Sequence, residues 1–178
     1  LSAEDKNFFD HPGIDAKGVT RAVIKNIDNI LSNKRLEGAS TITQQVAKNF
    51  LLTNEVSLKR KIKEAILAFR IEKAYSKKRI LELYLNEIYL GKGTYGVASA
   101  SLEYFNKSVK ELNYNEAALL AALPKAPSKY NPYNSIEKAT VRRNMVLKNL
   151  NDNGYISNNE FQKFLKQKIN LKKRKIFL

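Results

Sequence analysis

Apolar residues recur at helical spacing along most of the chain. They repeat at i, i+3 and i+4, the pattern of a helix with one apolar face. Ser57 and Ser76 stand where the N-caps of two such helices are expected. Helices are predicted over residues 16–31, 58–75, 77–89, 113–123, 136–150 and 158–169. Because strand-like alternation is scarce and no internal repeat is found, the pattern predicts an all-α fold with at most a minor β element.

One predicted helix, residues 58–75, is apolar on two faces. The first stripe comprises Leu58, Ile62, Ala65, Ile66 and Phe69, and the second comprises Leu67, Ala68 and Ile71. A helix that is apolar on both sides is predicted to lie inside the domain. Glu64 projects among the second stripe, and Arg60 and Lys61 precede it by four and three residues on the same side. A carboxylate between cations and apolar residues favours a cleft over an open surface.

The composition is that of a folded domain of ordinary size. Of the 178 residues, 43% are hydrophobic and 28% are charged, which excludes general disorder. We expect one domain over residues 1–165, and a basic tail or the start of a linker over residues 166–178. The longest apolar run, residues 117–123, is too short to cross a membrane. Since the chain begins without Met and close to its first motif, we expect a preceding portion that would hold any membrane anchor.

The chain is strongly basic. Lys and Arg number 32 against 17 Asp and Glu, a formal net charge of +15. This charge predicts an anionic partner, and composition leaves open nucleic acid, anionic lipid and a phosphorylated substrate. A solvated basic surface without a specific partner is the alternative. With no Cys and a single His, the chain lacks the usual ligand set of a zinc site.

The stretch AEDKNFFDHPGID places two acidic residues, Glu4 and Asp5, before two phenylalanines and the single histidine, His11. Three interpretations stay open from the residues alone: a helix cap, a solvated acidic patch, or a catalytic acid/base held by Phe8 and its neighbours. His11 is interpreted as a structural hydrogen-bonding residue rather than as a metal ligand.

The stretch GASTITQQVAKN concentrates short polar side chains. Five of six consecutive positions carry hydroxyl or amide groups, and a lysine follows: Ser40, Thr41, Thr43, Gln44, Gln45 and Lys48. A helix start with Ser40 as N-cap explains Ser40 alone. A cradle for an anion or a sugar explains the whole set. Residues 32–41 break the helical pattern, and a mobile loop is expected there.

Most other charged residues are interpreted as solvated helix faces. This set comprises Lys63, Lys73, Lys77, Arg79, Arg142 and Arg143. The two-sided apolar pattern around Glu64 keeps Arg60 and Lys61 out of this set.

Five stretches stand in order along the chain: EDKNFFDHPGID, GASTITQQVAKN, RKIKEAILAFRIEK, KKRILELYLN and RRNMVL. Together they closely resemble the five signature motifs of the family 51 glycosyltransferases. These are the peptidoglycan glycosyltransferase domains of class A penicillin-binding proteins and of the monofunctional transglycosylases. The resemblance covers Ala3 to Ile156. It implies a lysozyme-like helical fold and polymerisation of lipid II into β-1,4 glycan strands, with inversion at the anomeric carbon and release of lipid diphosphate.

The resemblance also implies two catalytic glutamates. Glu4 matches the general base, whose pKa the packing of Phe8 would raise. Glu64 matches a second glutamate near the donor diphosphate. A divalent cation, Mg²⁺ or Mn²⁺, would fit beside Glu64, and no organic cofactor is implied. The two glutamates are expected to meet across one groove.

The other matched positions form a substrate-binding set. It comprises Asp5, Phe8, His11, Ser40, Thr41, Thr43, Gln44, Gln45, Lys48, Asn49, Arg60 and Lys61. By the resemblance, its cations would bind the diphosphate and its hydroxyl and amide groups would hold the sugars. Asp5 and His11 would shape the loop that carries Glu4.

Partners and location follow from the same resemblance. They are lipid II and the growing lipid-linked strand, at the extracytoplasmic face of a bacterial cell membrane. A diphosphate substrate in an anionic membrane explains the charge better than nucleic acid does, so no nucleic-acid partner is expected. The stretch AALLAALPKAPSKYNPY looks like the bifunctional class A members, so a C-terminal transpeptidase domain of a longer parent protein is compatible with it. The helix that precedes the first motif in this family is missing from the chain.

Two other functions stay open. A lytic, lysozyme-like muramidase needs carboxylates placed for hydrolysis, and does not need the Lys and Arg group around Glu64. A non-enzymatic basic helical domain that binds nucleic acid or membrane would lose affinity steeply as salt rises. It gives no reason for the hydroxyl and amide cluster.

Overall fold

The computed structural model describes residues 1–31, 38–50 and 57–172. The expected mobile loop at residues 32–41 falls largely outside these ranges. The chain divides into two compact units. The N-terminal unit holds Leu1 and residues 5–84, and the C-terminal unit holds residues 2–4 and the chain from Leu85 onward. This division does not test the expectation of one domain over residues 1–165 followed by a tail, which stays a prediction.

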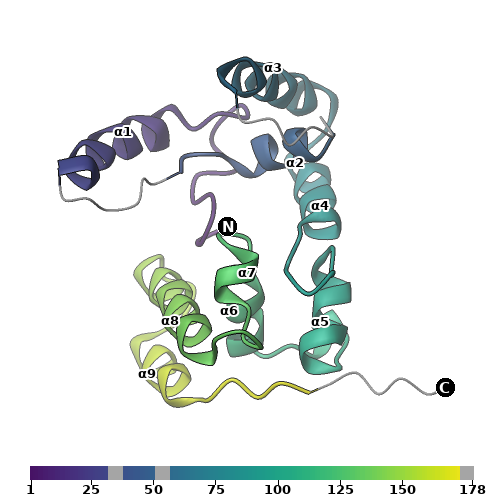
Figure 1. The fold of residues 1–178 in the computed structure, drawn as a ribbon, viewed down its shortest axis with the longest axis vertical. Coiled ribbons are helices and arrows are strands. Elements are labelled where there is room, and N and C mark those ends of the chain that lie inside the picture. The colour runs from purple at the N-terminus through teal and green to yellow at the C-terminus, as the bar shows by residue number, and fades with distance from the viewer. Residues whose placement is uncertain (32–37, 51–56, 173–178) are drawn as a thin grey trace. The chain divides into compact units, whose positions relative to one another are not determined.

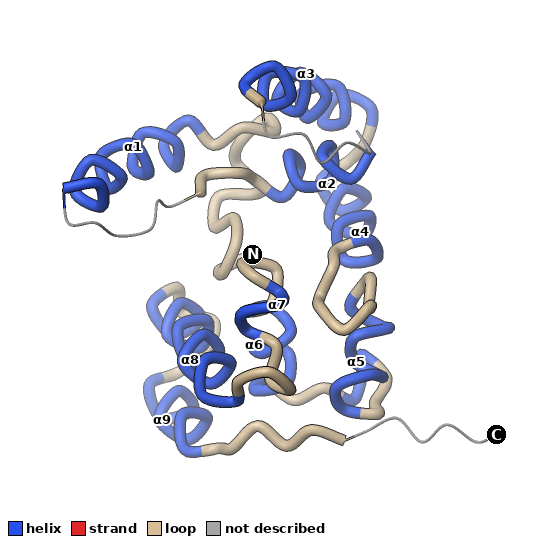
Figure 2. The backbone as a smooth tube through the Cα atoms, viewed as in Figure 1, coloured by secondary structure: helices blue, strands red, loops and turns tan. Residues whose placement is uncertain are grey.

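Helices joined by loops make up the described ranges (Figures 1 and 2). The first four helices are α1 (Ala16–Leu31), α2 (Ile42–Phe50), α3 (Leu58–Ala74) and α4 (Lys77–Glu87), and the boundary between the units falls inside α4. The C-terminal unit adds α5 (Val97–Phe105), the 3₁₀ turn η1 (Val109–Glu111), α6 (Tyr114–Ala122), α7 (Pro127–Tyr130), α8 (Ile136–Asp152) and α9 (Asn158–Lys166). Within the described residues the β structure is one antiparallel bridge, between Tyr89 and Tyr95. The all-α prediction is confirmed, although α5 and the short α7 were not predicted.

Helix starts follow the local sequence. Ser57 accepts a hydrogen bond from the Arg60 N–H at 3.1 Å, which confirms the predicted cap of α3. The predicted N-cap of α2 is wrong by one residue. Thr41 Oγ1 accepts from the Gln44 N–H at 3.1 Å, and Gln44 Oε1 accepts from the Thr41 N–H at 3.0 Å. This reciprocal pair is a capping box, which leaves the Ser40 hydroxyl available for another contact.

The two-sided burial predicted for α3 is also wrong. The second stripe is confirmed, since Glu64, Ala68 and Ile71 are buried. The first stripe faces solvent, with Leu58 exposed by 79% and Ile62 by 54%. Apolar spacing shows which residues share a face, but it does not show whether another element covers that face. None of the helices in the described ranges is both long and apolar enough to cross a lipid bilayer.

The core of the C-terminal unit forms where α6 packs on α8, and α8 also contacts α7 and α9. Arg143, on α8, is fully buried, so its assignment to the solvated set is wrong. Its guanidinium donates to the Gln167 carbonyl at 2.8 Å and to Asn144 Oδ1 at 2.7 Å. The Lys172 N–H donates to the Tyr104 carbonyl at 3.0 Å. The chain after α9 therefore follows the surface of this unit as far as it is described.

Asp15 caps α1. Its Oδ1 accepts from the Gly18 N–H at 2.9 Å and its Oδ2 accepts from the Asn7 amide at 3.2 Å. The Gly18 hydrogen bond lowers the pKa of Asp15; partial burial opposes that effect and the Asn7 amide supports it. A lowered folded-state pKa means that the stabilisation is complete above the ordinary Asp pKa of about 3.9 and is lost as pH falls below it.

Replacing Asp15 by Ala is therefore expected to lower the free energy of unfolding by about 1 kcal/mol at pH 7. The difference from the parent chain should shrink towards pH 3, because the unfolded chain takes up a proton at Asp15 below about pH 3.9 before the folded chain does. Urea unfolding followed by circular dichroism at both pH values measures it. Asp10→Ala, at an exposed position of the same loop, is the control. An equal loss at both pH values would contradict the capping role of the charged carboxylate.

Candidate active site

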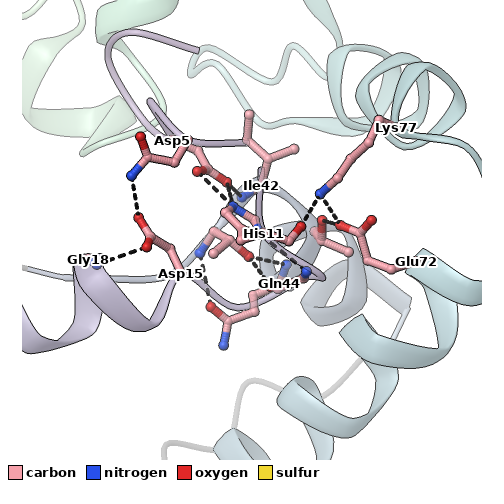
Figure 3. A network of polar contacts seen from close by, with 12 residues as sticks. Asp5, His11, Asp15, Gly18, Ile42, Gln44, Glu72 and Lys77 are labelled. Carbon is pink, nitrogen blue, oxygen red and sulfur yellow. Dashed lines mark hydrogen bonds and ion pairs between the residues drawn. The ribbon is translucent and has the colours of Figure 1, made fainter. Parts of the chain in front are cut away.

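Asp5 joins the loop before α1 to the start of α2. Its carboxylate is buried and accepts from His11 Nε2 at 3.0 and 3.1 Å and from the Ile42 N–H at 2.9 Å (Figure 3). His11 Nδ1 accepts from the Gly13 N–H at 3.2 Å. Since Nδ1 is the acceptor, the ring proton lies on Nε2 and points to Asp5. Asp5 and His11 thus fix the loop that follows Glu4, while their contact with substrate stays a prediction.

Gly13 brings the same loop against α3. It has φ of +100°, and a Cβ placed there would lie 3.2 Å from backbone atoms of Ala68. The Thr41 hydroxyl donates to the Gly13 carbonyl at 2.6 Å. A side chain at this position would therefore strain the backbone and separate the loop from both helices.

Lys77 lies inside the N-terminal unit, so the prediction that it is solvated is wrong. Its ammonium donates to Glu72 Oε1 at 2.7 Å and to the His11 carbonyl at 2.6 Å (Figure 3). It also lies 4.5 Å from the ring centroid of the fully buried Phe8. The Thr43 hydroxyl donates to the same Glu72 oxygen at 2.6 Å. The ion pair between Glu72 and Lys77 could not be predicted from helical periodicity, because the two residues lie on different helices, α3 and α4.

Replacing Lys77 by Met is expected to lower the free energy of unfolding by about 3 kcal/mol, the lower end for breaking a buried ion pair. Met keeps the aliphatic length but leaves Glu72 charged and the His11 carbonyl without its donor. Lys78→Met, at the exposed neighbouring position, is the matched control. Urea unfolding of both variants measures the difference, and equal midpoints would refute the structural role of Lys77.

Glu64 is the most buried acidic residue of the described chain, with 1% exposure. Lys61 Nζ lies 2.6 Å from Glu64 Oε1 and donates to the Ser40 hydroxyl at 2.8 Å. The second carboxylate oxygen, Oε2, is buried and has no hydrogen-bond partner in the described ranges, and the same holds for Arg60 Nε. The predicted placement of Lys61 on the same side of the helix as Glu64 is confirmed, whereas the contact between Lys61 and Ser40 was not predicted. Two buried polar atoms of this cluster thus lack the hydrogen bonds that such groups usually have.

The other residues of the expected substrate-binding set lie on α2. Thr43 and Gln44 are buried and engaged by protein partners, Gln45 is half-buried, and Lys48 and Asn49 are exposed. Thr43 and Gln44, both expected to hold sugars, therefore make hydrogen bonds within the protein. Thr43 binds Glu72 on α3, and Gln44 caps the start of α2. Their contacts with sugars, and the diphosphate contact of Lys48, stay predictions.

Glu4 belongs to the C-terminal unit. The side chain of Asn149 donates to the Ser2 carbonyl at 3.1 Å, and Ala3 packs against the core of that unit. Arg142 Nη2 lies 3.8 Å from Glu4 Oε1, and both side chains are mostly buried. The assignment of Arg142 to the solvated set is wrong. Its place in the fifth motif was the available signal, but spacing along the chain could not connect it to Glu4.

The approach of Glu4 to Glu64 across one groove stays a prediction, because the two residues belong to different units. The packing of Phe8 against Glu4 stays a prediction for the same reason. What the structure establishes is a separate charge environment for each glutamate. Glu4 faces a guanidinium and Glu64 faces an ammonium.

The cluster around Glu64 has the donor chemistry of a partial cation site. The described residues contain no group of three or more His, Cys, Asp or Glu side chains that could hold a metal ion. Mg²⁺ is commonly bound through one or two carboxylates together with substrate phosphates. Glu64 Oε2 therefore fits a divalent cation only when the substrate supplies the remaining ligands.

Comparisons with known proteins identify similar chains. A family profile described as "Transglycosylase" matches residues 1–151. The chain is 53% identical over 174 residues to penicillin-binding protein 1A of Rickettsia typhi, covering 98% of this chain and 22% of that protein. It is 51% identical over 173 residues to penicillin-binding protein 1A of Aquifex aeolicus, covering 97% and 23%. Penicillin-binding protein 1F of Bacillus subtilis is 51% identical over 160 residues, covering 90% and 22%.

A solved structure is also similar. The crystal structure of penicillin-binding protein 1A from Haemophilus influenzae aligns with a TM-score of 0.54 and 39% identity, covering 75% of this chain and 16% of that one. This likeness supports the helical, lysozyme-like fold expected from the motifs. The chain spans about a fifth of the length of the curated relatives described above.

Proposed function

Because the chain belongs to the transglycosylase family, we propose that it is a peptidoglycan glycosyltransferase that polymerises lipid II into β-1,4 glycan strands. The observation that carries the proposal is Glu64, a buried carboxylate that faces the ammonium of Lys61 beside the hydroxyl of Ser40. Cations grouped around a carboxylate suit the departure of a diphosphate better than they suit hydrolysis.

Glu4 is the general base of the proposed reaction. The 4-hydroxyl oxygen of the acceptor sugar attacks the anomeric carbon of the donor, and its proton passes to Glu4. The bond between the anomeric carbon and the diphosphate oxygen breaks with inversion. Arg142 Nη2 lies 3.8 Å from Glu4 Oε1, so a guanidinium faces the carboxylate that takes this proton.

Lys61, Arg60 and Lys48 receive the charge that develops on the departing diphosphate. Arg60 brings a buried Nε without a partner in the described ranges, and Lys61 is already oriented by Ser40. Glu64 would hold a divalent cation together with substrate phosphates, and that ion would neutralise further negative charge. The hydroxyl and amide groups of α2 position the donor sugars.

The parent protein is proposed to be longer than this chain and to act at the extracytoplasmic face of a bacterial cell membrane. The relatives extend well beyond the matched region, which supports a further domain in the parent, proposed to be a transpeptidase. An anchor in a segment before Leu1 would keep the active site beside its lipid-linked substrate.

Incubation with lipid II and Mg²⁺ tests the function. The expected products are glycan polymer and lipid diphosphate, with one lipid diphosphate released for each glycosidic linkage formed. Gel separation of labelled lipid II measures the polymer, and phosphate-ester analysis measures the lipid diphosphate. A parallel incubation with preformed glycan strands should release no fragments. Cleavage of those strands without polymer formation would instead identify a muramidase. Salt-sensitive binding to DNA or vesicles without either reaction would identify a binding domain.

A further inference from the structure

A hollow in the C-terminal unit lies between the start of α6 and the chain after α9. Its volume is about 190 Å³. Phe105, Leu119 and Ile169 form its apolar part, and the amide side chains of Asn113, Asn115 and Gln167 line its polar part. None of these residues belongs to the candidate active site.

Asn115 is the unusual member of this lining. It is 7% exposed, and its Nδ2 donates to Gln167 Oε1. Its Oδ1 is buried and has no hydrogen-bond partner within the described residues. A buried acceptor without a donor is unfavourable. This acceptor is closed off from solvent, and it would meet a ligand N–H or O–H group only if the Asn115 amide turned towards the hollow.

A second, more open hollow of about 490 Å³ adjoins the first, since Asn113 and Gln167 line both. Its lining includes Tyr114 and Phe164. Their rings pack with centroids 5.5 Å apart and an interplanar angle of 32°. Tyr114 is 54% exposed, so this aromatic pair presents a large apolar face to solvent.

The rim carries one paired acid, Glu116, and two lysines, Lys163 and Lys168, which form no ion pair within the described residues. The Glu116 carboxylate is held by the Lys107 ammonium at 2.7 and 3.0 Å. It also accepts from the Asn113 N–H at 3.0 Å. The amide groups of the lining suit a ligand that carries several hydrogen-bonding groups, and the two lysines are compatible with a carboxylate on that ligand.

We propose that these two hollows form one saccharide-binding groove, separate from the active site. Amide side chains both donate and accept, which matches neighbouring hydroxyl and acetamido groups of a sugar. Aromatic rings supply the apolar surface on which the C–H face of a sugar ring can lie. The groove's ligand class follows from its lining, whereas the identification of that ligand as the glycan product rests on the proposed function.

Titration of the ¹⁵N-labelled chain with a β-1,4-linked N-acetylglucosamine tetramer tests the groove by NMR. Saturable shifts of the side-chain amide signals of Asn115 and Gln167 are expected. Replacing Tyr114 by Ala should weaken binding by at least about fivefold, and Asn115→Leu by about tenfold. Tyr155→Ala removes a tyrosine of similar exposure, 64%, in the same unit and outside both hollows, and should leave the affinity unchanged.

The outcomes are distinct. Absence of saturable shifts in the groove up to millimolar tetramer, or shifts confined to other residues, would overturn the proposal. So would shifts with an unrelated tetrapeptide but not with the sugar, because the groove would then be a peptide site. If Asn115→Leu does not fold, Tyr114→Ala and its control decide the result. The titration uses a preformed oligosaccharide, so failure of lipid II polymerisation would count against the proposed function and not against the groove.

Discussion

Replacing Glu4 by Gln is expected to lower the rate of lipid II polymerisation by about 10²–10⁴-fold, the usual contribution of a general base. Gln has nearly the same size as Glu, but its amide cannot take the proton of the attacking hydroxyl. The neighbouring Arg142, 3.8 Å away, keeps a polar partner in the variant. The loss should therefore appear in kcat, with little change in KM for lipid II.

Initial rates of polymer formation measure this effect, with labelled lipid II over a range of concentrations. Asp10→Asn, at an exposed acidic position of the same loop, is the matched control and should retain the parent rate. Thermal unfolding of both variants should coincide with that of the parent chain. Polymer formation by Glu4→Gln within about threefold of the parent would remove Glu4 from the role of base.

Local chemistry explains which parts of the fold could be predicted. The cap of α3 at Ser57 was predictable because a cap depends on a side chain and a backbone N–H only three residues away. The start of α2 was misplaced by one residue because Ser40 and Thr41 are both good caps. Gln44 decides between them, since it lies three residues after Thr41 and completes the capping box.

Burial could not be predicted with the same success. The apolar stripe of Leu58 and Ile62 has the spacing of a core face, yet it is exposed. The fully buried Arg143 has the composition of a surface residue. In both cases the outcome depends on what packs against the helix from elsewhere in the chain. Arg143 is accommodated because the Gln167 carbonyl, 24 residues later, accepts from it.

The candidate site shows the same limit. The ion pair of Lys61 and Glu64 was predictable, because residues three apart share a helix face. The link between Glu4 and Arg142 joins the two ends of the motif series, and helical periodicity carries no information over that separation. Motif order placed both residues in one family pattern, but only the fold brings the guanidinium to the carboxylate.

Replacing Glu64 by Gln separates its chemical role from its structural one. Polymerisation is expected to fall by about 10²–10³-fold, the range found when one group that stabilises transition-state charge is removed. Stability should change little, because Gln keeps the volume of Glu and the Lys61 ammonium that loses its partner is 46% exposed to solvent. Rates with labelled lipid II at several Mg²⁺ concentrations, together with thermal unfolding, measure both effects.

Two further variants show whether Glu64 and Lys61 act together. Lys61→Met should also lower the rate, and the double variant should lose less than the product of the two single losses, because the ammonium and the carboxylate are in direct contact at 2.6 Å. Glu82→Gln is the control. Glu82 forms an ion pair with Arg79 at 2.7 Å, a similar distance, but both of these side chains are more than half exposed. Full additivity would mean that Glu64 and Lys61 act independently, and a Glu64→Gln rate equal to that of the control would mean that this carboxylate does not assist departure of the diphosphate.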